Sequence, residues 1–232
     1  MERRHEAERE VRYRRRRRLV IIGGVLVAIL GIVGVELLIH RPTGEERAVL
    51  AAAPRAARLS GCGPVRTIPP FPGDRDRSHI GGSDVAVMPP LSDYPSTPPV
   101  SGPHDAATLP SGVYRASPPV ERAIHSLEHA AVIVWYDPPV TSAPELERIR
   151  RFFSAGAAGD HVIVAPYDYP ADGGAGRLPP GIHMALAAWG RLQLCRDPDL
   201  TVARGFVLRY RFDAYQFYEY RGEAPERWFA AI

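Results

Sequence analysis

The longest uniformly hydrophobic segment of the chain runs from Leu19 to Ile39 and reads LVIIGGVLVAILGIVGVELLI. About 20 apolar residues suffice for a helix to cross the hydrocarbon core of a bilayer, so this segment predicts one transmembrane helix. Its acidic residue, Glu36, lies within a turn of the far end, where the carboxylate can reach the interface. The pattern therefore predicts a single-pass membrane protein.

The hydrophobic pattern becomes periodic again in the second half of the chain. Residues 131–136 (AVIVWY) and 161–167 (HVIVAPY) are continuous apolar runs rich in β-branched residues, which is typical of buried strands. Residues 143–153, between them, place apolar side chains at helical spacing and predict a short amphipathic helix. Residues 183–194 could form a helix or a strand, and their alternating hydrophobicity favours a strand.

A second amphipathic helix is expected after Asp197 or Asp199, since either side chain can cap its N terminus. The inward stripe of this helix would be Val202, Phe206, Val207 and Tyr210. An aromatic tail is expected to pack over it, formed by Tyr215, Phe217, Tyr218, Tyr220 and Trp228. Together these elements predict an α+β domain with a small, largely antiparallel sheet and two packed helices.

The chain between the anchor and this domain has little hydrophobic periodicity. Residues 40–60 are rich in alanine, arginine and glutamate, so we expect a helical or flexible stalk or linker without a core. From Cys62 to Pro119 the chain is dense in proline, glycine and serine, which largely excludes regular ladders. This long Pro/Gly-rich segment would open an extracytoplasmic domain that spans residues 61–232.

Part of the Pro-rich segment favours the polyproline II conformation, namely Tyr94, Pro95, Pro98 and Pro99. Such a segment can serve as a ligand for an aromatic groove on a partner. It can instead pack against this domain's own Trp135 or Trp189, and we favour that second interpretation.

Charge adds an orientation to this plan. Nine arginines precede Leu19, including the run Arg14 to Arg18, so the net charge of +3 belongs to the tail and the rest of the chain is net acidic. Arginines directly before an apolar stretch are the positive-inside signal. We therefore expect residues 1–18 in the cytoplasm, against anionic headgroups and not nucleic acid. A cleavable signal peptide is the alternative, but Ala51 to Ala53 lie well beyond the apolar stretch.

The chain has two cysteines, Cys62 and Cys195. Disulfides persist outside the cytoplasm, so we predict that the two residues pair. Closing so large a loop would contribute on the order of 4 to 5 kcal/mol by restricting the unfolded chain. The alternative is two buried free thiols.

Six histidines lie outside the membrane segment and its flanks, and two of them stand out by their spacing. His125 and His129, in HSLEH, are four residues apart and share a face whether the segment is helical or extended. Two such imidazoles can share a metal ion, with a third ligand from His104 and a fourth from His79 or Met184. A thioether would favour copper, whereas a carboxylate or water would favour zinc.

The same histidines also have a purely structural interpretation, because histidines beside a buried strand often satisfy backbone groups or pair with a carboxylate such as Glu128. His161 and His183 flank apolar segments and are interpreted as structural or surface residues. A helical zinc protease is excluded, because Ser126 and not glutamate follows His125. The chain also lacks a Gly-x-Ser-x-Gly elbow and a dinucleotide fingerprint.

These observations favour a binding protein over an enzyme. The leading hypothesis is a tethered domain that binds copper or zinc, in that order of preference. The alternative is a metal-free interaction or assembly protein of the cell envelope, which would use the Pro-rich loop and the aromatic tail to contact a protein partner. A hydrolase with a metal-bound water is the least favoured.

Several blocks of sequence occur in a recognisable order: DYPSTPPVSGPH at 93–104, GVY at 112–114, AIHSLEHAAVIVWYDP at 123–138, VIVAPY at 162–167 and ALAAWGR at 185–191. Between Cys62 and Glu226 the chain thus resembles the bacterial family known as domain of unknown function 3105. The resemblance implies a membrane-anchored domain outside the cytoplasm, and it implies no mechanism.

The family blocks also contain histidines that match His79, His104, His125 and His129, which strengthens the metal hypothesis. One departure is Ala130, where the family usually has glycine. If the backbone approaches a ligand at that point, this substitution would alter the site.

Overall fold

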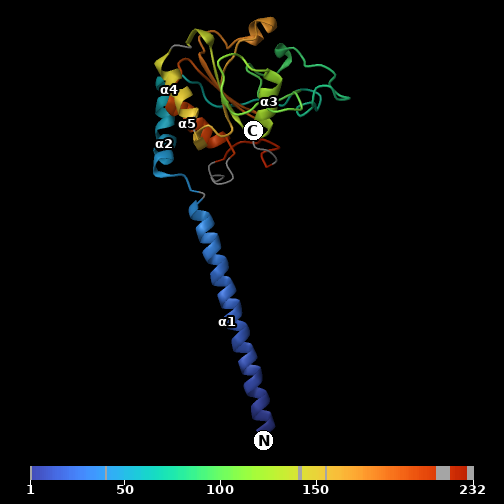
Figure 1. The fold of residues 1–232 in the computed structure, drawn as a ribbon, viewed down its shortest axis with the longest axis vertical. Coiled ribbons are helices and arrows are strands. Elements are labelled where there is room, and N and C mark those ends of the chain that lie inside the picture. The colour runs from blue at the N-terminus through green and yellow to red at the C-terminus, as the bar shows by residue number, and fades with distance from the viewer. Residues whose placement is uncertain (1, 40, 141–142, 155, 213–219, 229–232) are drawn as a thin grey trace. The chain divides into compact units, whose positions relative to one another are not determined.

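A computed structural model describes residues 2–39, 41–140, 143–154, 156–212 and 220–228 of the chain (Figure 1). The chain divides into two compact units, Met1–Arg41 and Pro42–Ile232. In the first unit, α1 (Glu2–Ile39) is a continuous helix that contains the apolar span Arg14–Val35. Among the described residues it is the one helix long and apolar enough to cross a membrane, as the predicted anchor requires. The orientation of the anchor stays a prediction from the arginine pattern.

The second unit is an α+β domain, which confirms the expected fold class. Its sheet has the strand order β1-β6-β5-β3-β4-β2. The sheet is mixed: β4 lies parallel to β3 and β2, and the other three neighbouring pairs are antiparallel. The strands are β1 (Arg66–Thr67), β2 (Gly112–Val113), β3 (Val132–Tyr136), β4 (Val162–Pro166), β5 (Met184–Ala188) and β6 (Arg191–Cys195).

The parallel pairing of β3 and β4 has a local cause. Parallel neighbours need a long crossover, and α4 (Pro144–Phe153) lies in the connection between these strands. Pro144 occupies the first turn of α4, where a missing N–H costs nothing. Both strands are fully buried, which is why each reads as a continuous apolar run.

Residues 183–194, expected as one strand, form the hairpin β5–β6. The chain reverses at Trp189 and Gly190, and Gly190 takes a positive φ of 65°. Alternation in hydrophobicity continues through the turn, because both strands use the same two faces of the sheet. The pattern alone therefore did not reveal the reversal.

The two faces of the sheet carry separate layers of core. Side chains alternate along β3, so Trp135 lies in one hydrophobic cluster and Val134 in the other. On the Val134 face, α4 and α5 (Leu200–Tyr210) pack against the sheet. On the Trp135 face lie α3 (Val120–Glu128) and the Pro-rich segment, so helices cover both sides (Figure 1).

The segment expected to be a stalk is a further helix of the domain, α2 (Gly44–Leu59). A reciprocal capping box between Thr43 and Glu46 begins it. Its buried Ala53 lies against Gly205 of α5, where an added Cβ would come within 2.5 Å of the Ala53 Cβ. The stripe of α2 consists mostly of alanines, so the hydrophobic pattern was too weak to predict this packing.

The Pro-rich segment packs on its own domain. Leu91, Tyr94 and Val100 are buried in the same cluster as Trp135 and Trp189. The Tyr94 hydroxyl donates a hydrogen bond to the Pro103 carbonyl at 2.5 Å. Pro98 and Pro99 are buried as well. The segment is therefore part of the core layer through Pro98 and Pro99, whereas Pro95 is exposed.

Both ends of the domain are tied to this core. The predicted disulfide between Cys62 and Cys195 is present and joins residues 133 positions apart. The predicted cap Asp199 accepts a hydrogen bond from the Val202 N–H at the start of α5. Of the predicted aromatic tail, Tyr220 and Trp228 pack against Phe212, with ring centroids 5.3 and 4.4 Å away. The other members, Tyr215, Phe217 and Tyr218, lie outside the described residues.

Candidate metal centre

Four histidines and two glutamates gather at the C-terminal end of α3. His125 and Glu128 lie on its last turn, and His129 is its C-cap residue. The Pro-rich segment runs alongside, where a parallel bridge pairs His79 with His104. That bridge is held by hydrogen bonds from Ile80 N–H to His104 O at 2.7 Å and from His104 N–H to Ser78 O at 3.0 Å.

The first group of converging side chains is His79, His104, His125 and Glu128. One ligand atom from each lies within 4.8 Å of the others. His79 is exposed, whereas the other three are buried. The sequence predicted the three histidines but not that Glu128 would join them, although the structural interpretation named Glu128 as a carboxylate partner.

Two of these imidazoles are held in one tautomer by the backbone. His104 Nδ1 lies 2.7 Å from the Gly102 carbonyl oxygen, and His125 Nδ1 lies 2.7 Å from that of Asp105. A carbonyl can only accept, so each Nδ1 carries the proton and donates it. In the neutral imidazoles, Nε2 then carries the lone pair, on the side of the cluster. This arrangement is the one that metal-binding histidines adopt.

Glu128 is a buried carboxylate with cationic and imidazole neighbours. Its Oε1 accepts a hydrogen bond from Arg77 Nε, and its Oε2 lies 3.0 Å from His104 Nε2. The second contact lacks the alignment of a hydrogen bond, since His104 Nε2 has no hydrogen-bond partner among the described residues. Burial would raise the pKa of Glu128, but His104 in its protonated form and the guanidinium of Arg77 outweigh burial and hold that pKa below the usual value.

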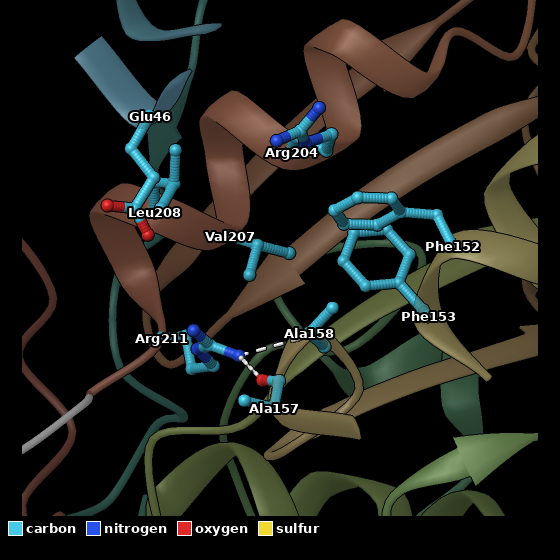
Figure 2. A pocket seen from close by; sticks show the side chains of 9 residues that line it. All are labelled: Glu46, Phe152, Phe153, Ala157, Ala158, Arg204, Val207, Leu208 and Arg211. Carbon is cyan, nitrogen blue, oxygen red and sulfur yellow. Dashed lines mark hydrogen bonds between the residues drawn. The ribbon is translucent and has the colours of Figure 1, made fainter. Parts of the chain in front are cut away.

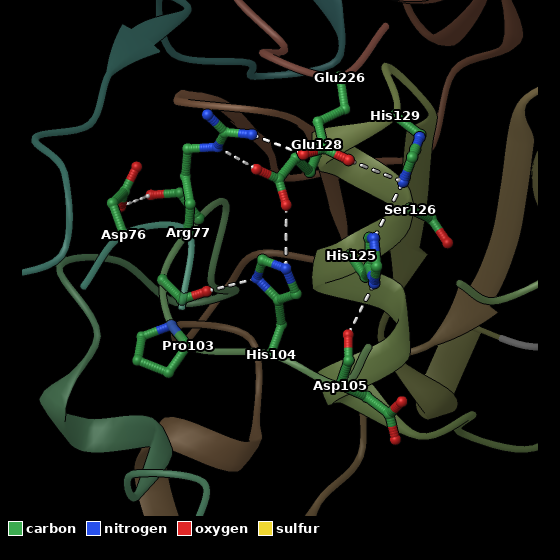
Figure 3. Close-up of polar contacts among 12 residues, drawn as sticks. Asp76, Arg77, Pro103, His104, Asp105, His125, Ser126, Glu128, His129 and Glu226 are labelled. Carbon is green, nitrogen blue, oxygen red and sulfur yellow. Dashed lines mark hydrogen bonds and ion pairs between the residues drawn. The ribbon is translucent and has the colours of Figure 1, made fainter. Parts of the chain in front are cut away.

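Arg77 connects this carboxylate to a second one. Its Nη2 donates to Glu226 Oε1 at 2.6 Å, so one guanidinium joins Glu128 of α3 to the C-terminal segment (Figure 3). Arginine is suited to this task because its planar fork presents several donors in fixed directions. Sequence reasoning did not identify Arg77 or Glu226 as part of the site.

His129 belongs to a second group, with His125 and Glu226. His129 Nε2 lies 2.9 Å from His125 Nε2 and 3.5 Å from Glu226 Oε2. Figure 3 shows His129 and His125 facing each other along α3, with His104 on the other side of His125. The expectation that His104, His125 and His129 meet at one point is therefore met only in part.

Burial and like charge both act on His125. Desolvation lowers its pKa, and the nearby His104, His129 and His79 lower it further. Its hydrogen bond to the Asp105 carbonyl opposes these effects without cancelling them. His125 therefore stays neutral, and so able to bind a cation, at a lower pH than an ordinary histidine does.

Gly102 positions His104 and was missed by sequence reasoning. It has φ of 115°, and a Cβ there would lie 2.7 Å from Tyr94 Cε1 and 2.9 Å from Phe71 Cδ2. Beside it, Asp76 Oδ1 accepts hydrogen bonds from the Phe71 N–H and the Ser101 hydroxyl, both at 2.6 Å. The loop that presents His104 is thus tightly fixed. In the sequence, the glycine within SGPH was the feature that could have indicated this constrained backbone.

Met184, named as a fourth ligand, lies away from the cluster. It is fully buried on β5 among the side chains of the Val134 face, whereas His125 and His104 lie on the other side of the sheet. Strand alternation accounts for this, since Ala185 and Ala187 are the β5 residues that face α3. Met184 is therefore not a ligand of this cluster.

Three other residues named from the sequence, His183, His161 and Ala130, are not among the candidate ligands. His183 Nδ1 pairs with Asp137 Oδ2 at 3.1 Å, and His161 Nδ1 lies 3.0 Å from Asp160 Oδ1. Ala130 has φ of 65° directly after the C-cap of α3. A helix commonly ends on such a left-handed residue, and glycine adopts that conformation without a steric penalty. Backbone conformation is therefore a sufficient reason for a glycine at this position.

A cavity of about 200 Å³ lies elsewhere, between α2, α4 and α5 (Figure 2). Its floor is apolar, with Phe153 and Val207, and two arginines border it. Arg204 donates to Glu45 at 2.6 Å, and Arg211 Nη1 donates to the Ala157 carbonyl at 3.0 Å. Because both guanidiniums already serve the fold, the histidine cluster is the better candidate site.

Fold and site together define an α+β domain that follows an apolar helix and carries a histidine–carboxylate cluster at the end of α3. The family model described as "Protein of unknown function (DUF3105)" matches residues 91–226, and the chain belongs to this family. The matched region includes His104, His125, Glu128, His129 and Glu226. No curated protein and no solved structure matches the chain.

Proposed function

We propose that the domain binds one divalent transition-metal ion, zinc in the first place, through His79, His104, His125 and Glu128. Two of these imidazoles have Nδ1–H donors fixed on backbone carbonyls, both at 2.7 Å. Each leaves an Nε2 lone pair among other ligand atoms in a mostly buried setting. Backbone hydrogen bonds at Nδ1 also suit purely structural histidines, so the observation that carries the proposal and favours a metal is the convergence of one ligand atom from each of the four side chains within 4.8 Å.

The spacing of the cluster supports a four-coordinate ion. With zinc–nitrogen bonds of about 2.0–2.1 Å, the ligand atoms of a tetrahedral site lie about 3.3 Å apart. His104 Nε2 and Glu128 Oε2 are already 3.0 Å apart, and the whole group lies within 4.8 Å. Small side-chain rotations close the remaining distance. His79, the exposed member, would be the ligand that meets an ion from solvent.

The donor set favours zinc over copper. Copper headed the expectation from sequence because of a thioether from Met184, and that side chain lies on the other face of the sheet. What remains is three imidazoles and a carboxylate, which suit a divalent ion of intermediate softness. Four protein ligands also leave no coordination position for a reactive water, so the role is storage, delivery or structural support and not hydrolysis.

The membrane anchor gives this site its place in the cell. With α1 across the bilayer and its arginines on the cytoplasmic side, the domain and its metal face the outside, and the arginines contact anionic headgroups. The alternative, a metal-free partner of an envelope protein, keeps the exposed Pro95 and Trp228 as a contact surface but loses two of its prolines. Pro98 and Pro99, which would have formed part of its contact surface, are buried in the domain itself.

Elemental analysis of the full-length chain in detergent tests the proposal. After loading with zinc and dialysis, the unmodified protein should retain about one ion per chain, and His104→Ala and His125→Ala should each lose most of it. His183→Ala is the matched control, since it removes a histidine that pairs with Asp137 outside the cluster. Zinc-free unmodified protein, or full retention by both cluster variants, would disprove the proposal.

A further inference from the structure

His125 is common to both groups of converging side chains, while their other members differ. The His104 group consists of His79, His104, His125 and Glu128, and the His129 group of His125, His129 and Glu226. The two groups therefore lie on either side of one imidazole. Such an arrangement can hold two ions at once, or it can offer a single ion two alternative positions.

The hydrogen bonding of His125 decides this. Its Nδ1 is occupied by the hydrogen bond to the Asp105 carbonyl at 2.7 Å, so Nε2 is its remaining ligand atom. A neutral imidazole nitrogen has one lone pair and can bind one ion at a time. Two ions cannot share His125 in this arrangement. The groups are therefore alternative positions for a single ion.

The two positions are close enough for the ion to pass between them. His125 Nε2 and His129 Nε2 are 2.9 Å apart, which is close to the ligand spacing of a tetrahedral site. Glu226 Oε2 lies 3.5 Å from His129 Nε2. An ion bound to His125 can therefore exchange His79, His104 and Glu128 for His129 and Glu226 while the bond to His125 is kept throughout.

Arg77 balances charge during such a move. It donates to Glu128 through Nε and to Glu226 through Nη2, so the carboxylates of the two positions share one guanidinium. When the ion occupies one carboxylate, the other stays paired with Arg77. Neither position leaves a carboxylate without a compensating charge.

We infer that zinc moves between these two positions by pivoting on His125, and that the His129 group is the exchange position through which the domain passes zinc to an acceptor. This inference rests on the proposed function. Glu226 is 29% exposed and Glu128 is 1% exposed, so an acceptor's ligands can reach an ion at the His129 group from the Glu226 side, away from the buried Glu128. A direct exit past the exposed His79 is the competing route.

Stopped-flow transfer of zinc from the loaded full-length chain to the chromophoric chelator 4-(2-pyridylazo)resorcinol tests the inference. His129→Ala and Glu226→Gln should slow transfer by about tenfold or more, equivalent to about 1.4 kcal/mol of barrier. Their equilibrium affinity for zinc should fall less than that of His104→Ala. Glu223→Gln, a nearby carboxylate that pairs with Arg191, is the control and should transfer at the unmodified rate.

The outcomes separate the inference from the proposed function. Absence of bound zinc in the unmodified protein would overturn both. One bound zinc with unchanged transfer in His129→Ala and Glu226→Gln would overturn the inference alone, and so would two zinc ions that both depend on His125. Slower transfer in His79→Ala without any effect of His129→Ala would assign the exit to His79 and contradict the inference.

Discussion

His104 Nε2 lies 3.0 Å from Glu128 Oε2, and the two side chains are 0% and 1% exposed. A carboxylate buried to this degree has lost its hydration, so the surrounding protein must supply compensating charge. Arg77 supplies part of it by a hydrogen bond to the other carboxylate oxygen. The oxygen that faces His104 is not aligned for a hydrogen bond with it, and a cation between the two would satisfy both atoms.

Replacing Glu128 by glutamine should weaken zinc binding by on the order of tenfold or more, because a neutral amide oxygen is a poorer ligand than a carboxylate. Competition with a chelator of known affinity measures the change. Glu121→Gln, on the first turn of the same helix, is the control and should bind as the unmodified protein does. Equal affinity in the Glu128 variant would remove this carboxylate from the ligand set.

Substituting Gly102 by alanine should lower the free energy of unfolding by about 2–4 kcal/mol, because a left-handed φ and overpacking act together. The new Cβ would lie 2.7 Å from the Tyr94 ring. Zinc affinity should fall too, since the Gly102 carbonyl orients His104. Gly181→Ala has a positive φ of 76° but open space around its Cβ, so it isolates the backbone effect. Equal losses for the two variants in urea unfolding would refute the steric part.

The contact between α2 and α5 can be tested by exchanging the small residues at its centre, Ala53 and Gly205. Gly205→Ala should destabilise the domain, because overpacking of about 1–3 kcal/mol exceeds the roughly 1 kcal/mol that alanine gains in a helix. Adding Ala53→Gly restores the space, since the two Cβ atoms would otherwise lie 2.5 Å apart. Thermal unfolding of the single and double variants measures the coupling. If the double variant is the less stable one, α2 does not pack as described.

Alkaline pH should unfold the domain through its buried phenols. Burial raises the pKa of Tyr94, Tyr167 and Tyr169 well above the usual value near 10. Each hydroxyl donates to a backbone carbonyl, that of Pro103, Ala175 or Pro118. The folded state keeps these protons, while the unfolded chain releases them above about pH 10. The phenols therefore contribute fully to the free energy of unfolding below that pH, and their contribution is lost as pH rises.

Urea midpoints measured from pH 8 to pH 11.5 test this expectation. The chain contains no lysine, so tyrosines are the main side chains that titrate in the upper part of this range. Tyr169→Phe removes one buried phenol and should make the decline less steep. A midpoint that stays constant above pH 10 would contradict the account.

The elements predicted well from sequence are those with a strong, local hydrophobic pattern. Val132–Tyr136 and Val162–Pro166 are buried on both faces, and α4 carries a regular apolar stripe, so short-range spacing was enough. By contrast, α2 buries small alanines against Gly205 of α5. The pattern of α2 alone cannot show that a glycine on another helix leaves room for this contact. The hairpin turn at Gly190 was hidden by uninterrupted alternation.

The candidate site likewise has one feature that the sequence predicted, the shared face of two histidines, and one that it did not, the orientation of the rings. Spacing placed His125 and His129 on one face, and this holds because both lie at the end of α3. Which way each ring faces depends on partners far along the chain: Asp105 and Gly102 orient His125 and His104, while Glu226 draws His129 toward a different group. Such long-range contacts follow from the tertiary fold, which no local pattern contains.

X-ray absorption at the zinc edge of the loaded full-length protein tests the central claim most directly. The account predicts a first shell of nitrogen and oxygen at about 2.0–2.1 Å, with outer-shell scattering from three imidazoles. A sulfur shell near about 2.3 Å, or a spectrum of hydrated zinc without imidazole scattering, would contradict it.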